Sequence, residues 1–346
     1  MLRKKGGKFA VTALLLLGLA VAAAGIWKYS TKKPEYIFLM GEVRSFEDYP
    51  MFKNFENEIT NLGCVPRVLE IEESENSSIR QIQKLSETVN DNTVCIIVNA
   101  ASNENLAGIL QKYQERGIKI LSCISEVSAL YRLLHVGTVD PRTAGPEMMT
   151  ETARLCGEKG QFAIVSGAPH SVSATTLMME VRYRYEQRRH PGMILSDILF
   201  GYENVETASE KIKQFLEETP DTSALICLSE RMTEAACMAV QALEAEDHVT
   251  IIGMGDPDYL EDYVKDEKLK MELFYCNMAD FGTMVAQLSQ KVVSGEVKGT
   301  PGEIVKLDQG NYLIKEDEIL TEDDIPGSEV YLYQEYKRYQ TSSLTD

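Results

Sequence analysis

The sequence has few histidines, and its cysteines follow no metal-binding pattern. Four histidines stand among 346 residues, and none of the seven cysteines lies in a C-x-x-C pair. Zinc sites built from Cys and His need such spacing, so we expect no metal site and no cofactor. Cys95, Cys123 and Cys227 lie in or beside apolar runs, where a free thiol packs as a small hydrophobic group. Buried free thiols are therefore the default expectation, and one disulfide is left open.

Sequence motifs for nucleotide binding and acyl transfer are also missing. The chain has no G-x-x-x-x-G-K-[ST] phosphate loop and no G-x-S-x-G elbow. The stretch "GMGDPD" lacks the third glycine of the G-x-G-x-x-G fingerprint. The few histidines give no triad order, so we expect a protein that is not an enzyme.

Positive charge is scarce outside the N-terminus. The chain carries a net charge of -18, and residues 34–346 alone carry -25. Binding to nucleic acid needs a basic surface that can neutralise phosphates. The charge therefore argues against nucleic acid as a partner.

Residues 1–33 form a basic leader with seven Lys/Arg and no acidic residue. Its uncharged run from Phe9 to Trp27 has 19 residues, enough for a helix to cross a hydrocarbon core of ~30 Å. The positive flank places the N-terminus in the cytoplasm and the body outside. The small residues of "AVAAAG" leave a cleaved signal peptide open. We favour an uncleaved anchor, because the run exceeds the usual signal-peptide core of ~7–15 residues. The body is then extracytoplasmic, tethered to the membrane, or secreted if the leader is cleaved.

Beyond the leader, short apolar runs alternate with amphipathic stretches. "YIFLMG" precedes "MFKNFENEITNLG", and "VCIIVNA" precedes "NLAGILQKYQERG". Continuous apolar strands separated by helical patterns predict βαβ units and parallel sheets covered on both faces. About ten such units are too many for one doubly wound domain. The sequence therefore predicts an α/β protein with two lobes that divide near "HVGTVDPRTAG".

The order and spacing of several segments carry a family resemblance. "IIVNAASNENLAGILQKYQERGIKIL", "VGTVDPRTAG" and "HPGMILSDILFGYENVETA" occur in series, and the similarity covers roughly residues 36–320. The chain resembles type I periplasmic binding proteins of the ribose, rhamnose and autoinducer-2 kind. That resemblance implies two Rossmann-like lobes joined by three hinge crossings, with a ligand in the cleft between them.

The leader and the resemblance together imply a domain organisation. The N-terminal signal anchor or signal peptide spans residues 1–33, and the first lobe spans 34–138 plus about 274–302. The second lobe spans 139–273 plus about 303–320. An acidic, Tyr-rich tail spans 321–346 and is compatible with an extra helix.

The resemblance also suggests which residues contact a ligand. Polar side chains after strand ends, and aromatic residues after the first strand, are where the family contacts sugars. Glu230 is the strongest candidate, because it keeps an acid near a family ligand position. The candidate ligand-binding residues are Arg44, Phe46, Tyr49, Phe52, Asn99, Glu126, His170, Ser173, Glu230, Arg231, Asp256, Tyr275 and Asn277.

Structural roles compete with these ligand-binding roles. Glu230 fits a helix N-terminus, where the dipole favours an acid, and Asn99 fits a helix cap. Tyr49 and Phe52 fit aromatic packing within the lobe. Arg231 fits a solvated surface position, and His170 a loop, so these alternatives stay open.

The chain departs from the family at several of these positions. Ile124 stands where sugar binders carry an Asp, and Glu126 follows nearby. His170 replaces an Arg or an Asp-Gln pair, and in "GMGD" Asp256 is either displaced by one residue or absent from the role. Tyr275 and its neighbours replace an Asp or Gln on the late hinge strand. Either the ligand differs from a common polyol, or ligand binding has given way to contact with a protein.

Two functions are therefore expected. The first is a solute-binding protein that captures a small polar, sugar-like ligand for the permease of an ABC importer. The second is a membrane-anchored, ligand-sensing subunit that contacts a sensor histidine kinase. The absence of a lipoprotein cysteine before Cys64, the favoured anchor and the altered sugar contacts motivate the second.

Overall fold

The computed structural model describes residues 32–41, 49–71, 76–102, 104–125, 127–139, 141–169, 172–266, 268–275, 277–296 and 337–340. Within these ranges, no helix is both long and apolar enough to cross a membrane. The expected N-terminal helix of residues 1–33 lies almost wholly outside the described residues.

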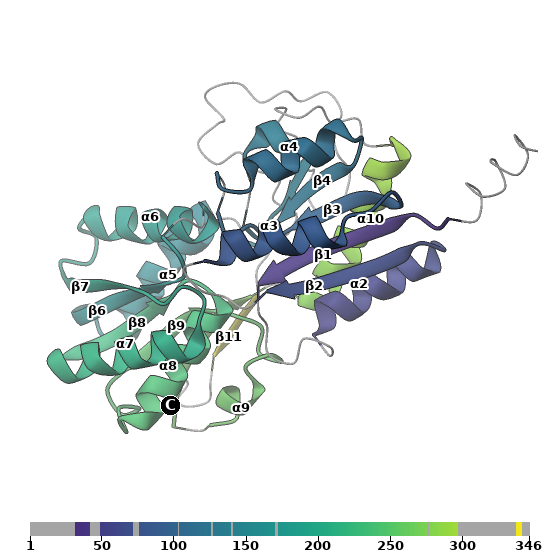
Figure 1. Cartoon of the computed structure of the whole chain (residues 1–346). Helices are drawn as coiled ribbons and strands as arrows, with labels where there is room; N and C mark the ends of the chain where they lie inside the picture. Colours follow the sequence, from purple (N-terminus) through teal and green to yellow (C-terminus); the bar gives the residue numbers. More distant parts are fainter. Residues whose placement is uncertain are drawn as a thin grey trace, which may run out of the picture.

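The first lobe is built on a five-stranded parallel sheet in the order β2-β1-β3-β4-β5. Helices α2 and α10 pack on one face, and α3 and α4 on the other (Figure 1). β1 is buried along its whole length, as its unbroken apolar run predicts. The strands are β1 (Glu35–Gly41), β2 (Val65–Ile71), β3 (Thr93–Val98), β4 (Lys119–Cys123) and β5 (Leu134–Val136), and the helices are α2 (Pro50–Asn61), α3 (Ser77–Thr88), α4 (Ala107–Glu115), the 3₁₀ turn η2 (Ala129–Tyr131) and α10 (Met278–Ser294).

The second lobe holds a six-stranded sheet in the order β11-β10-β9-β8-β6-β7. Its first five strands along the chain are parallel, and β11 pairs antiparallel with β10. Helices α5 and α6 cover one face, and α7 and α8 cover the other. The strands are β6 (Lys159–Ser166), β7 (Gly192–Phe200), β8 (Thr222–Cys227), β9 (Thr250–Met254), β10 (Lys270–Tyr275) and β11 (Lys337–Gln340), and the helices are α5 (Pro141–Leu155), α6 (Val172–Glu186), α7 (Val205–Glu218), α8 (Glu230–Ala242) and α9 (Glu261–Val264).

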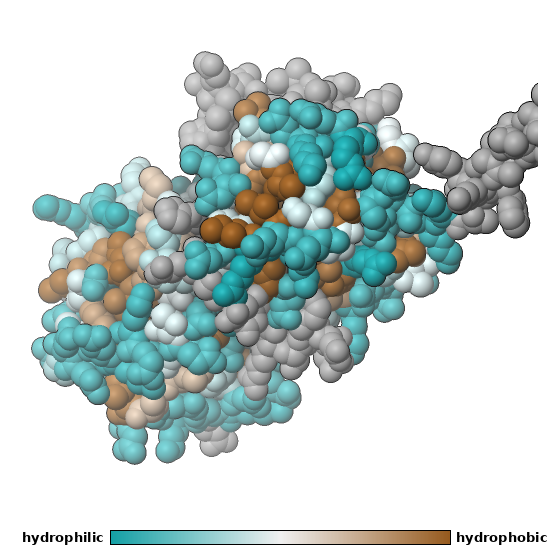
Figure 2. Space-filling view, viewed as in Figure 1, coloured by the Kyte–Doolittle hydropathy of each residue, from teal (hydrophilic) through white to brown (hydrophobic). Residues whose placement is uncertain are grey.

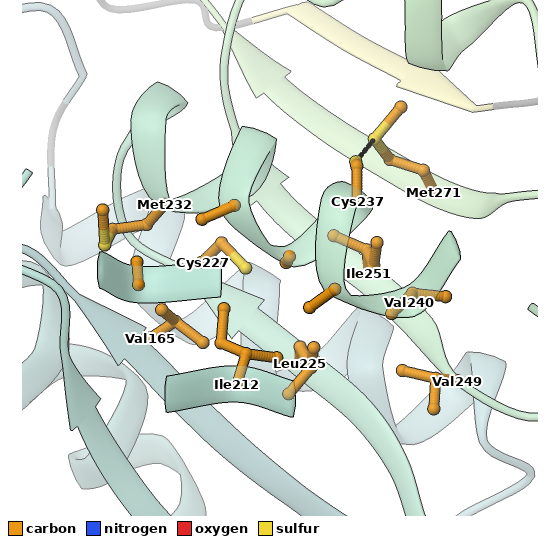
Figure 3. Close-up of a cluster of buried hydrophobic side chains, with 14 of the residues drawn as sticks. Val165, Ile212, Leu225, Cys227, Met232, Cys237, Val240, Val249, Ile251 and Met271 are labelled. Carbon is orange, nitrogen blue, oxygen red and sulfur yellow. Dashed lines mark hydrogen bonds between the residues drawn. The ribbon is translucent and has the colours of Figure 1, made fainter. Parts of the chain in front are cut away.

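The core of the second lobe contains two of the cysteines. Figure 3 shows Cys227 and Cys237 among aliphatic side chains, with the Cys237 thiol 3.7 Å from the sulfur of Met271. The six cysteines in the described ranges are all free, and four of them are buried. Burial raises the pKa of the Cys237 thiol, so it stays protonated and packs as a small hydrophobic group.

The described elements on either side show that the chain passes between the lobes at two places. The first passage lies between β5 and α5, and the second between β10 and α10. The third expected crossing, near residues 302–303, lies outside the described residues. Residues 337–340 of the tail form strand β11, so an extra helix at that position is wrong. The structure confirms the α/β prediction with two lobes and parallel strands.

Candidate functional site

Glu230 lies at the carboxyl ends of β8 and β9, two neighbouring strands of the second sheet. Glu230 is the first residue of α8 and follows β8. The helix begins with Ser229, whose side chain accepts a hydrogen bond from the Met232 amide, a standard N-cap. Glu230 thus lies at the positive end of a helix dipole, where a carboxylate is stabilised.

Both carboxyl oxygens of Glu230 are hydrogen-bonded. Tyr49 Oη donates to Oε1 at 3.0 Å, and the backbone amide of Asp256 donates to Oε2 at 2.9 Å. Tyr49 precedes α2 in the first lobe, whereas Glu230 and Asp256 belong to the second. Glu230 is therefore a point of contact between the two lobes.

Aromatic rings surround this contact. The Tyr49 ring meets Phe52 edge-on at 5.4 Å between centroids, and it meets Tyr259 at 5.9 Å. Tyr259 Oη donates to Glu234 Oε2 at 3.0 Å, within the second lobe. Tyr259 packs against the cores of both lobes. Edge-to-face pairs of this kind add favourable quadrupole interactions to the burial of the rings.

Asp256 provides a further link between the lobes. Its Oδ2 accepts from the Met278 amide at the start of α10, at 3.5 Å, and its Oδ1 accepts from the Asp258 amide at 3.0 Å. The preceding Gly255 has φ +151°, and a Cβ there would approach Leu260 to 2.8 Å and Glu230 to 3.3 Å. Glycine lets the backbone after β9 pass close enough for its amide to reach Glu230.

Glu203 is a neighbouring acid that sequence reasoning did not single out. Its Oε2 accepts from Ser229 Oγ at 2.6 Å, and its backbone carbonyl accepts from Arg231 Nε. Burial raises the pKa of its carboxyl, which Ser229 and Arg231 oppose. Its φ of +57° is rare for a residue with a side chain. Both polar neighbours of Glu230 in the sequence are therefore bound to Glu203.

The electrostatics of Glu230 are set mainly by burial. Desolvation raises its pKa to about 7, the hydrogen bonds from Asp256 and Tyr49 lower it, and the nearby carboxylates of Asp256 and Glu234 raise it. A carboxyl with this pKa changes its charge near neutral pH. Such shifts are frequent at functional sites, although structural clusters show them too.

The other described candidates make structural contacts, mostly at the ends of strands and helices. Asn99 Oδ1 accepts from the Ser125 amide at 3.1 Å, which joins the ends of β3 and β4. Asn277 caps α10 by accepting from the Asp280 amide at 3.0 Å. Phe52 is 2% exposed and lies in the core of the first lobe, and Tyr275 ends β10.

Several predicted residues are not described. Arg44, Phe46, Glu126 and His170 lie outside the described residues, and so does the side chain of Ser173, whose backbone belongs to α6. The structure therefore brings together Tyr49, Glu230, Asp256 and, through Glu203, Arg231. Across the described ranges, no three His, Cys, Asp or Glu residues are grouped so that they could hold a metal ion.

Comparisons with solved structures show the fold. A solute-binding protein of an ABC transporter from Clostridium phytofermentas, with bound L-rhamnose, matches with a TM-score of 0.71 and 17% identity, over 78% of this chain and 84% of that one. A periplasmic solute-binding protein from Actinobacillus succinogenes, with bound D-allose, matches with a TM-score of 0.68 and 15% identity, over 90% and 99%. The XylFII–LytSN complex matches with a TM-score of 0.65 and 18% identity, over 76% and 94%.

The sequence itself identifies the family. The model of the periplasmic binding protein domain matches residues 44–296, which include both sheets except β1 and β11. This match confirms the family resemblance that the order of the sequence motifs indicated. The chain therefore belongs to the type I periplasmic binding proteins.

Proposed function

We propose that this protein is an extracytoplasmic solute-binding protein that binds a small polar, sugar-like ligand between its lobes and delivers it to an ABC importer. Family membership supports binding outside the cytoplasm rather than catalysis. The ligands of the similar structures, L-rhamnose and D-allose, support a sugar-like molecule.

The observation that carries this proposal is the contact set of Glu230. A carboxylate that accepts a hydroxyl at 3.0 Å beside an aromatic ring offers the two interactions that a sugar needs. In this proposal, a ligand hydroxyl donates to Glu230, and an apolar ring face of the ligand packs against Tyr259. Arg44, Phe46, Glu126 and the other candidate residues remain proposed contacts.

Calorimetric titration of the full chain against pentoses, hexoses, deoxysugars, autoinducer-2 and small acids tests the proposal. A ligand at 100 times its Kd should raise the free energy of unfolding by about 2.7 kcal/mol, which a thermal melt detects. Glu230→Ala should weaken binding, whereas Glu217→Ala, on the exposed side of α7, should not. Absence of saturable binding across the panel would contradict the proposal.

A second function is a ligand-sensing subunit that partners a membrane sensor histidine kinase. The similar fold in the XylFII–LytSN complex favours it, because that relative was solved together with a second protein. In this alternative the leader is an uncleaved anchor that keeps the subunit beside its partner. Co-purification from membranes distinguishes the two: recovery of a kinase supports the second, and recovery of a permease and its ATPase supports the first.

A further inference from the structure

The backbone at Ile124 has a conformation that a β-branched residue rarely adopts. Its φ is +60°, in the left-handed region, where the two branches at Cβ crowd the backbone. Glu158, Arg188 and Glu244 also have a positive φ, but each follows the end of a helix, where left-handed residues are common. Ile124 instead follows strand β4, so the end of a helix does not explain its conformation.

Hydrogen bonds on both sides hold Ile124 in this conformation. Its amide donates to the Val136 carbonyl at the end of β5, at 2.9 Å. The Ser125 amide donates to Asn99 Oδ1 at 3.1 Å, and the Ser125 carbonyl accepts from the Ala100 amide at 3.3 Å. These bonds join the ends of β3, β4 and β5. A strained backbone conformation persists only where its surroundings fix it in this way.

The loop that holds Ile124 is itself fixed by a side chain of α3. Gln81 is fully buried, and its Nε2 donates to the Asn99 carbonyl at 2.6 Å. Its Oε1 accepts from the Ala101 amide at 3.0 Å. One buried amide group, bonded at both ends, thus fixes the backbone on both sides of Ala100. The support of Ile124 is therefore rigid, and its side chain is kept in one place.

Ile124 lies where the first lobe adjoins the second. Val136 ends β5, and from there the chain passes to α5 of the second lobe. The side chain of Ile124 is partly exposed and packs against the core cluster that contains Tyr49. Tyr259 of the second lobe packs against the same cluster. The exposed part of Ile124 is therefore an apolar surface at the boundary between the lobes, where the proposed function places the ligand.

We propose that Ile124 is a specificity-determining residue, which selects a sugar-like ligand with an apolar group on the side that faces the first lobe. This inference rests on the proposed function and adds the class of ligand. Isoleucine offers no hydrogen bond, so a hydroxyl buried against it loses its bonds to water without compensation, whereas a methyl group gains from burial. One group of this size changes affinity by about 10- to 100-fold.

Calorimetric titration of the full chain with hexoses and their 2-deoxy and 6-deoxy counterparts tests the inference. Each deoxysugar lacks one hydroxyl of its hexose, and we expect one deoxysugar to bind about 10- to 100-fold more tightly than its hexose. In Ile124→Asn this preference should be lost or reversed. Asparagine tolerates the left-handed backbone and offers a donor and an acceptor, so the variant should fold and accept a hydroxyl. Ile124→Val keeps a branched apolar side chain and should keep the preference.

The matched control is Ile194→Asn, which makes the same change at a residue that is 55% exposed near the amino end of β7. It should keep both the affinity and the preference. An unaltered preference in Ile124→Asn would overturn the inference, and so would an equal loss in Ile194→Asn. Sugars that bind without any deoxysugar being preferred would overturn it while leaving the proposed function intact. Absence of binding by every sugar would contradict the proposed function and this inference together.

Discussion

Glu230 combines burial with two hydrogen bonds, and these act on its pKa in opposite directions. Burial disfavours the charged carboxyl, while Tyr49 and the Asp256 amide favour it. Burial has the larger effect and raises the pKa to about 7. The carboxylates of Asp256 and Glu234 face it with the same sign, and the nearest cation along α8, Arg231, is bound to the Glu203 carbonyl. The charge of Glu230 is therefore sensitive to pH in the physiological range.

The stability of the protein should fall as the pH rises from 5 to 8. The folded-state pKa of Glu230 is raised from 4.5 to about 7, so between these values the folded state binds more protons than the unfolded state. Its stabilising contribution is complete below pH 4.5 and is lost as the pH passes 7, by at most about 3 kcal/mol. Urea unfolding at four pH values measures how the free energy of unfolding changes with pH. Glu230→Gln should reduce this pH dependence. An equal pH dependence in the variant and the unchanged protein would contradict the raised pKa of Glu230.

At the scale of single elements, α10 follows a strand of the second lobe but packs in the first. Phe281, Met284 and Leu288 enter the core that α2 and the first sheet share. The two helices approach closely at Gly282, where a Cβ would lie 2.0 Å from the Met51 carbonyl oxygen. Glycine at this position is therefore required by the neighbouring backbone rather than by a turn.

Gly282→Ala should lower the free energy of unfolding by about 1–3 kcal/mol, because the added methyl forces α10 away from α2. Gly108→Ala in α4 is the matched control. It also lies in a helix, but its Cβ would meet no atom within 4 Å. The control should gain about 0.5–1 kcal/mol from helix propensity. Chemical unfolding of both variants measures the difference, and an equal effect of the two changes would refute the close approach.

The second sheet gains its edge strand from the far end of the chain. β11 pairs with β10, and Gln340 Nε2 donates to Glu272 Oε2 at 2.7 Å. Glu272 is fully buried, and Arg154 of α5 lies 3.8 Å from the same oxygen. The strand therefore covers a sheet edge and supplies a donor to a buried acid.

At the scale of the whole molecule, charge and hydropathy separate the leader from the body. Figure 2 shows a largely hydrophilic face over α4 and α7, with hydrophobic side chains gathered between α3 and α4. Ile79, in α3, is 54% exposed. The four Lys/Arg residues before Phe9 suit the cytoplasmic side of a membrane, as the proposed anchor requires.

If the leader is an anchor, the protein recovered from cells should keep its full mass of 38.8 kDa and sediment with membranes. Intact-mass spectrometry of the protein from the membrane fraction measures this directly. Carbonate washing should not release it, because a spanning helix is held by hydrophobic burial rather than by charge. A smaller protein in the soluble fraction, with an N-terminus near residue 24, would instead show that a signal peptide is cleaved.

Much of the fold could be predicted from periodicity. The runs "YIFLMG" and "VCIIVNA" became β1 and β3, because continuous apolar residues in short segments suit strands buried on both faces. β11 could not be predicted, because four polar or aromatic residues carry no strand signal without the edge of β10 beside them. Local propensity does not report a pairing partner about 65 residues away.

The candidate site was predicted in part. Glu230 and Tyr49 were named because the family resemblance implies ligand contacts at their positions, yet no pattern indicated that they touch. Glu203 was missed, since an acid in a loop before a helix is ordinary until Ser229 and Arg231 are seen to bind it. The only available signal was its place between two polar loop residues, which many surface acids share.

The sequence by itself determined the alternation of strands and helices, the two-lobed α/β class, the family and the acidic charge of the body, because these depend on composition and on order along the chain. Only the tertiary structure decided that Tyr49 meets Glu230, that α10 packs against α2, and that β11 covers β10. Each of these contacts joins residues that are distant in sequence. Their free energy depends on geometry and burial, which no local pattern encodes.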